Sequence, residues 1–148
     1  MKLKITQTIH LSFCIAIILF STVTLLINKN VLFYDTNLDR TMPFNPIFPI
    51  VAILGIVAGI VMFNKKIAGI EKDLSFEEKF MHYQTAFLMR CALCEAGALL
   101  NIVGCFITHN LFFMLFATAS FIALVLSRPS KNKVIADLQL QYPDTEGL

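Results

Sequence analysis

The chain has 148 residues, of which 57% are hydrophobic, and its mean hydropathy is +0.72. Soluble domains carry about 45 to 50% apolar residues, so this composition excludes an ordinary water-soluble domain and indicates an integral membrane protein. The formal net charge of +2 is small and scattered along the chain, which excludes the clustered basic surface of a nucleic-acid-binding protein.

Four apolar segments are long enough to cross a bilayer, whose hydrocarbon core takes roughly 20 residues of helix. In chain order they are 9–27, 44–63, 84–108 and 111–127. The first is too long for a signal-peptide core and has no small-residue cleavage site after it, so we expect an uncleaved span. Pro43, Pro46 and Pro49 open the second span, where first-turn N–H groups lack helical partners. The sequence therefore predicts an all-α fold, a polytopic four-transmembrane-helix bundle that forms one domain over residues 1–148.

The third helix has its own start signal before the membrane. Ser75 and Glu78 match the S-x-x-E capping box, which predicts a helix start near Phe76. An aromatic stripe follows at helical spacing and is typical of interfacial anchoring and packing: Phe76, Phe80, Tyr83 and Phe87.

The tail 128–148 is predicted to lie in the cytoplasm. Arg128-Pro129-Ser130 ends the fourth helix. The segment KNKVIADLQL is expected to form a short helix, on the membrane surface or against residues 71–80, and YPDTEGL is expected to fray.

Lysine and arginine are distributed unequally between the two ends of the predicted bundle. Nine lie on the side of the termini (Lys2, Lys4, Lys65, Lys66, Lys72, Lys79, Arg128, Lys131 and Lys133), against two on the other side (Lys29 and Arg40). Short cationic loops are retained in the cytoplasm, so both termini are predicted to be cytoplasmic. The same basic segments are expected to contact anionic lipid headgroups.

One half of the third span is polar or small, and the other half is apolar. At 100° per residue the first half comprises Gln84, Arg90, Cys91, Cys94, Glu95, Gly97, Ala98, Asn101, Gly104, Cys105 and Thr108. Gly55 and Gly59 of the second span form a GxxxG pattern, which favours close helix approach. We therefore predict that Gly55, Gly59, Gly97 and Gly104 are helix-packing residues.

Arg90 and Glu95 are the only charged residues in the four predicted spans. With a span start near Ala86, Arg90 is expected roughly 6 Å below the boundary, within snorkelling reach, and Glu95 roughly 13 Å deep. An acid there costs on the order of 2.5 to 3.5 kcal/mol. We therefore predict a buried polar network of Glu95, Arg90, Asn101 and Gln84, joined indirectly because a five-residue separation turns two side chains about 140° apart.

Two functions fit this network. In the first, the protein is a structural or accessory membrane component, and the network fixes helix packing. In the second, it is part of a proton- or cation-coupled transporter in which Glu95 carries the ion, because desolvation favours a protonated carboxyl and intramembrane acids often mark ion pathways. Four spans are few for a transporter, so the expected partners, besides the lipid bilayer, are a homo-oligomer or another membrane protein.

Other chemistry receives little support from the sequence. Cys91 and Cys94 form a C-x-x-C, but within an apolar helix, where thiol exchange is suppressed. His10, His82 and His109 do not flank a common haem site, and no protease, nucleotide or nucleophile-elbow motif is present. We therefore expect no enzyme activity, no cofactor and no metal.

The C-terminal half resembles a family of small, uncharacterised bacterial four-helix membrane proteins. The matching residues are Lys79, Tyr83, Arg90, Ala92, Leu93 and Glu95, then Arg128, Pro129, Ser130, Lys131, Lys133, Asp137, Leu138 and Leu140. Ala96 replaces the glycine that follows the glutamate in that pattern. The resemblance implies the four-helix architecture and a location in a bacterial inner (plasma) membrane. It includes Arg90 and Glu95 among the matching residues, but it implies no activity.

Overall fold

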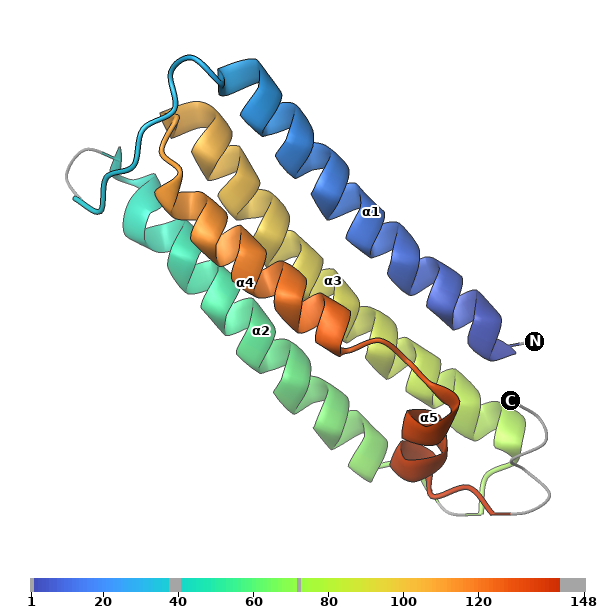
Figure 1. Ribbon diagram of the computed structural model, residues 1–148. Coiled ribbons are helices and arrows are strands. Elements are labelled where there is room, and N and C mark those ends of the chain that lie inside the picture. Colours follow the sequence, from blue (N-terminus) through green and yellow to red (C-terminus); the bar gives the residue numbers. More distant parts are fainter. Residues whose placement is uncertain (1, 38–40, 72, 142–148) are drawn as a thin grey trace.

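The computed structural model describes residues 2–37, 41–71 and 73–141 and builds them into an all-α fold, as predicted. The described part contains five helices, shown in Figure 1: α1 (Lys2–Asn28), α2 (Phe44–Ala68), α3 (Phe76–Thr108), α4 (Phe112–Leu126) and α5 (Lys131–Leu138). The part of the tail that was expected to fray, 142–148, lies outside the described residues.

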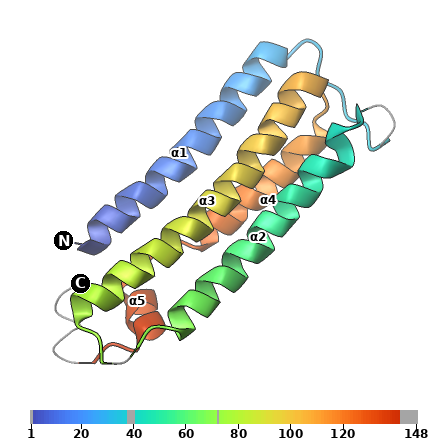
Figure 2. The ribbon, with the colours of Figure 1, turned by 180° about the vertical axis from the view of Figure 1, so that it is seen from behind.

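Helix α3 is the centre of the bundle and contacts α1, α2 and α4. Seen from behind, α1 and α2 flank α3 on opposite sides and α4 lies beyond it (Figure 2). We call the end where α1 and α3 begin and α5 lies the basic end, and the opposite end, with the α1–α2 connection and the α3–α4 turn, the loop end. One long side of α3 is therefore left between α1 and α2.

Three helices, α1, α2 and α3, are long and apolar enough to cross a membrane. Helix α4 has only 15 residues, or about 22 Å at 1.5 Å per residue, which is less than the hydrocarbon core. It satisfies the same criterion only together with α5, which is bent away from it by 79°. The prediction of four spans is thus shown for three, with α4 as a fourth only in combination with α5.

Local sequence explains where the helices begin. Ser75 accepts the amide of Glu78, whose carboxylate accepts the amide of Ser75, so the predicted capping box is confirmed and α3 starts at Phe76. In α2, Asn45 has non-helical angles of φ −102° and ψ 120°. A residue before proline is driven toward extended backbone, and Pro46 follows Asn45, so the regular part of α2 starts there.

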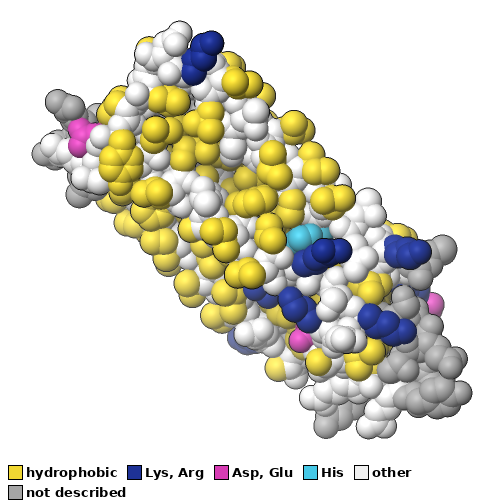
Figure 3. All heavy atoms as spheres, viewed as in Figure 1, with side chains coloured by type: hydrophobic (Ala, Val, Ile, Leu, Met, Phe, Trp, Pro, Cys, Tyr) yellow, Lys and Arg dark blue, Asp and Glu magenta, His cyan; other side chains and the backbone are white. Residues whose placement is uncertain are grey.

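The surface has the pattern of a multi-span membrane protein. Exposed aliphatic and aromatic side chains cover the middle of α1, α2 and α4, and Figure 3 shows them as a broad hydrophobic belt. Lysine and arginine side chains gather on the basic end in the same view. The chain is therefore a small helical membrane protein, and its interior lies around α3.

Candidate functional site

The four glycines predicted to pack helices, Gly55, Gly59, Gly97 and Gly104, all lie at contacts between helices. A Cβ atom at Gly55 would stand 2.9 Å from the backbone oxygen of Leu93, and one at Gly97 would stand 2.9 Å from the Cα of Ala52. Gly59 lies against Arg90, and Gly104 lies against the rings of Phe48 and Phe113. At Gly55 and Gly97 the absence of a side chain therefore allows the backbones of α2 and α3 to pack in direct contact.

Asn101 supplies the polar contact at the α2–α3 seam. Its side chain is fully buried, and Nδ2 donates to the carbonyl oxygens of Phe48 and Gly97, both at 2.9 Å. Its Oδ1 is buried without a hydrogen-bond partner among the described residues. Asn101 thus ties α2 to α3, but it does not contact Arg90 or Glu95 through any described hydrogen bond.

The predicted buried network of Arg90 and Glu95 is wrong. Both residues are only half-buried, and no hydrogen bond or ion pair joins them in the part of the chain that the structure describes. Gln84 is also half-buried and has no described hydrogen bond. The two charges fail to meet because they point from opposite sides of α3, as their five-residue separation requires.

Glu95 lies at the edge of the face of α3 that remains between α1 and α2. We call this the open face and define it by Thr85, Ala92, Glu95, Ala96 and Val103, which are exposed except for the half-buried Glu95. The prediction placed Glu95 inside because it assigned Glu95 to the polar half of α3 and expected neighbouring helices to cover that half. Instead, α1 packs through the stripe containing His10 and Cys14, on the side of Phe87 and Cys91, and covers this edge incompletely.

Arg90 lies on the other side of α3, against α2. Its guanidinium carbon stands 5.5 Å from the centroid of the Phe63 ring, within cation–π range. Its Nε is buried without a hydrogen-bond partner, and none of its nitrogens has a described hydrogen bond or ion pair. Arg90 is therefore a cation that packing holds in position, and its donors have no partner in the described part of the chain.

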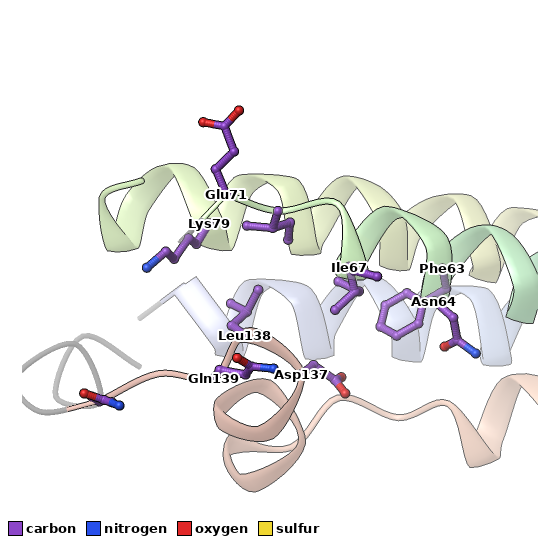
Figure 4. A pocket seen from close by; sticks show the side chains of 11 residues that line it. Phe63, Asn64, Ile67, Glu71, Lys79, Asp137, Leu138 and Gln139 are labelled. Carbon is purple, nitrogen blue, oxygen red and sulfur yellow. The ribbon is translucent and has the colours of Figure 1, made fainter. Parts of the chain in front are cut away.

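Arg90 lines a cavity of about 280 Å³ at the basic end, which we call the Arg90 cavity. Four helices and the segment after α4 contribute to it; its polar lining includes Asn64, Arg90, Ser127, Lys133 and Asp137. A neighbouring cavity of about 760 Å³ shares Phe63, Asn64 and Asp137 and extends beneath α5. Figure 4 shows the larger cavity, with Glu71 pointing away from it.

Helix α5 brings two opposite charges to the Arg90 cavity. Lys133 donates its Nζ to the carbonyl oxygens of Leu126 and Arg128, at 3.0 and 3.3 Å, and so neutralises the end of α4. Burial raises the pKa of the Asp137 carboxyl, and the positive charges of Lys133 and Arg90 oppose this shift. Helix α5 is held over the cavity by Val134 and Leu138, which are buried in the core.

Sequence reasoning assigned Lys133 to a basic surface segment and gave Asp137 no site role, so it missed this cavity. The short-helix prediction for the tail was correct, since α5 spans Lys131–Leu138. Its amphipathic spacing, with Val134 and Leu138 four residues apart, was the signal that α5 packs on the bundle. This spacing could not identify Arg90 as the residue that lies beneath α5.

The four cysteines offer no exposed thiol in this structure. Cys14, Cys91, Cys94 and Cys105 are free and buried. Within the described residues, no group of three or more His, Cys, Asp or Glu side chains is placed to hold a metal ion.

Comparison with known proteins gives no match: no protein-family model, no curated protein and no solved structure matches the chain. The resemblance of the C-terminal half to a bacterial family therefore stays a prediction. The three to four long apolar helices support the coarser part of that prediction, a small helical membrane protein.

Proposed function

We propose that the protein is a structural or accessory component of a bacterial plasma membrane, with both termini in the cytoplasm, that pairs with a second copy of itself through the open face of α3. The distribution of charge supports this orientation. Lysines and arginines from both terminal segments and from the end of α2 gather at the basic end (Figure 3), as expected of the cytoplasmic side.

The single observation that carries the pairing is Glu95, an acid without a described partner on the open face. It lies five residues, or about 7.5 Å, further from the basic end than Arg90. An ionised carboxylate within hydrocarbon costs on the order of 2.5 to 3.5 kcal/mol, so a partner that satisfies the carboxyl stabilises the protein in the membrane.

A second copy fits this requirement for two reasons. Copies with the same orientation carry Glu95 at the same depth, and two protonated carboxyl groups can each donate and accept a hydrogen bond across a two-fold axis. Ala92 and Ala96 are exposed one turn apart on the same face, and small residues at this spacing allow two helices to approach closely. The open face is thus self-complementary.

Cysteine crosslinking in membranes tests the pairing. The native cysteines are buried, so Ala96→Cys adds a thiol on the open face, and Ile122→Cys adds a matched thiol on the exposed side of α4. We expect oxidation to give a disulfide-linked dimer for Ala96→Cys only. Equal crosslinking at the two positions, or crosslinking of Ala96→Cys only to a different protein, contradicts the proposal.

Substitutions of Glu95 test the role of the acid in the same assay. Glu95→Gln keeps a group that donates and accepts, so we expect crosslinking of Ala96→Cys to persist, whereas Glu95→Leu removes the hydrogen bonds and should reduce crosslinking. Undiminished crosslinking in Glu95→Leu shows that the acid does not direct pairing.

Ion transport through Glu95 is the alternative function. Glu95 lines neither the Arg90 cavity nor the larger cavity beneath α5, so neither of these cavities gives it a path to water. Proton flux in liposomes separates the two functions: flux that is present in the native chain and lost in Glu95→Gln, with the dimer intact, favours transport.

A further inference from the structure

The Arg90 cavity contains a cation whose donors have no partner among the described residues. Arginine presents five N–H donors in a rigid, planar fork, and those of Arg90 have no described hydrogen bond or ion pair. Asp137 lines the same cavity but forms no described ion pair with Arg90. The structure therefore fixes Arg90 against Phe63 without satisfying its hydrogen-bonding capacity.

The cavity lies at the depth where the chain passes from apolar to basic residues. On α2, Phe63 and Asn64 line it, and Lys65 and Lys66 follow directly. Beyond α4, Ser127 lines it and Arg128 follows. These neighbouring cations indicate that the cavity opens at the boundary between hydrocarbon and headgroups, where lipid phosphates are concentrated.

The charge and size of the cavity favour an anion with a small tetrahedral head. Among the described lining residues, Arg90 and Lys133 contribute two positive charges against one acid, Asp137, and Asn64 adds an amide that can donate. Phosphate oxygens match the guanidinium fork in a bidentate arrangement. The neighbouring larger cavity beneath α5 has apolar lining from Phe63, Ile67 and Leu138, which provides space for carbon groups attached to the phosphate.

We propose that the Arg90 cavity binds the phosphate of an anionic ligand, with Arg90 as the main contact and Lys133 as the second. The site lies on the opposite side of α3 from Glu95 and is independent of pairing through the open face. The phosphate belongs either to an anionic lipid headgroup that enters from the bilayer or to a free phosphate compound from the aqueous side.

Native mass spectrometry of the full chain in detergent, titrated with phosphatidylglycerol or phosphatidylcholine, tests the site. We expect tighter binding of phosphatidylglycerol than of phosphatidylcholine, and about tenfold weaker phosphatidylglycerol binding in Arg90→Gln and in Lys133→Gln, as for loss of a charge-assisted hydrogen bond. Lys4→Gln removes an exposed cation at the same end but outside the cavity and should leave binding unchanged.

Asp137→Asn is expected to change the affinity for phosphatidylglycerol in the opposite direction. Removing the acid that the structure describes in the Arg90 cavity should tighten phosphatidylglycerol binding about three- to tenfold, because the anion no longer faces the Asp137 carboxylate. A merely structural role of Asp137 predicts unchanged or weaker binding. Lys133 is exposed, so Lys133→Gln keeps the test valid should Arg90→Gln fail to fold.

Inorganic phosphate distinguishes the two sources of the ligand. Competition by excess phosphate, with the same dependence on Arg90 and Lys133, indicates a free phosphate compound, whereas binding of phosphatidylglycerol that excess phosphate does not displace indicates a lipid. Equal binding by the native chain, Arg90→Gln and Lys133→Gln, or equal binding of phosphatidylglycerol and phosphatidylcholine, overturns the proposal.

Discussion

The guanidinium of Arg90 stacks over the ring of Phe63, with 5.5 Å between the guanidinium carbon and the ring centroid. Phe63 is buried near the end of α2, and its ring also meets the ring of Tyr83 edge-on at 5.7 Å between centroids. The contact joins α2 to α3 at the basic end and holds the charge of Arg90 at the cavity, where no described residue forms a hydrogen bond with it.

Replacing Phe63 should therefore weaken the bundle and release Arg90. A partly desolvated cation–π contact contributes about 1 to 2 kcal/mol, so Phe63→Leu is expected to lower the free energy of unfolding by at least this amount, with lost packing added. Unfolding in mixed detergent, followed by circular dichroism, measures the change. In the double variant with Arg90→Gln the two losses should not add; strict additivity argues that the ring and the cation do not interact.

Gly55 and Gly59 belong to the same GxxxG motif, but the structure leaves different amounts of space for a Cβ atom at the two positions. A Cβ at Gly55 would meet the Leu93 backbone oxygen at 2.9 Å, whereas one at Gly59 would meet the flexible Cγ and the backbone oxygen of Arg90 at 3.4 Å. Gly55→Ala should cost about 1 to 3 kcal/mol, typical of overpacking, because backbone must move. Gly59→Ala should cost clearly less. The same unfolding assay compares the two, and equal losses would show that the glycines do not differ.

Local signals in the sequence predicted the helices well, because they depend on neighbouring residues. The capping box at Ser75 and Glu78 gave the start of α3, and apolar length located α1, α2 and α3. The short α4 was harder to assign, since 15 residues followed by a sharp bend resemble a span in composition but not in length.

The surroundings of the two charges could not be predicted, because they depend on contacts distant in sequence. Helical periodicity places Glu95 on a particular side of α3, but it does not reveal that α1 and α2 leave that side partly uncovered. Likewise, Arg90 and Asp137 are separated by a complete helix and a turn. Only the bend after α4 brings α5 back over Arg90.

Asn101 should contribute to stability through the α2–α3 seam. Its amide donates to Phe48 and Gly97 while fully buried, and hydrogen bonds between membrane helices average about 0.6 kcal/mol, with larger values near 1.7. We expect Asn101→Leu, which removes the amide and adds different packing, to lower unfolding free energy by about 1 kcal/mol or more. Thr108→Val provides the matched control, because it removes a hydroxyl that donates to the Gly104 carbonyl oxygen and accepts the Asn110 amide but has no described bond to α2. It should change stability less.

Protonation should loosen the start of α3. The hydrogen bonds from the Ser75 side chain and backbone lower the pKa of Glu78 below its ordinary value of 4.5, and the charge of His82 adds to this effect. A lowered pKa means that the folded first turn prefers the carboxylate. Its stabilising contribution is complete above the unfolded pKa and is lost as pH falls through the folded value.

NMR of the chain in detergent can follow this transition through the Ser75 amide, which donates to the Glu78 carboxylate at 3.0 Å. We expect its chemical shift to change with a midpoint below pH 4.5, together with fraying of Phe76 and Glu77. Glu78→Gln keeps the acceptor but cannot titrate, so the amide shift should then be independent of pH in this range. A midpoint at or above pH 4.5 in the native chain would show that the capping box does not hold the carboxylate form.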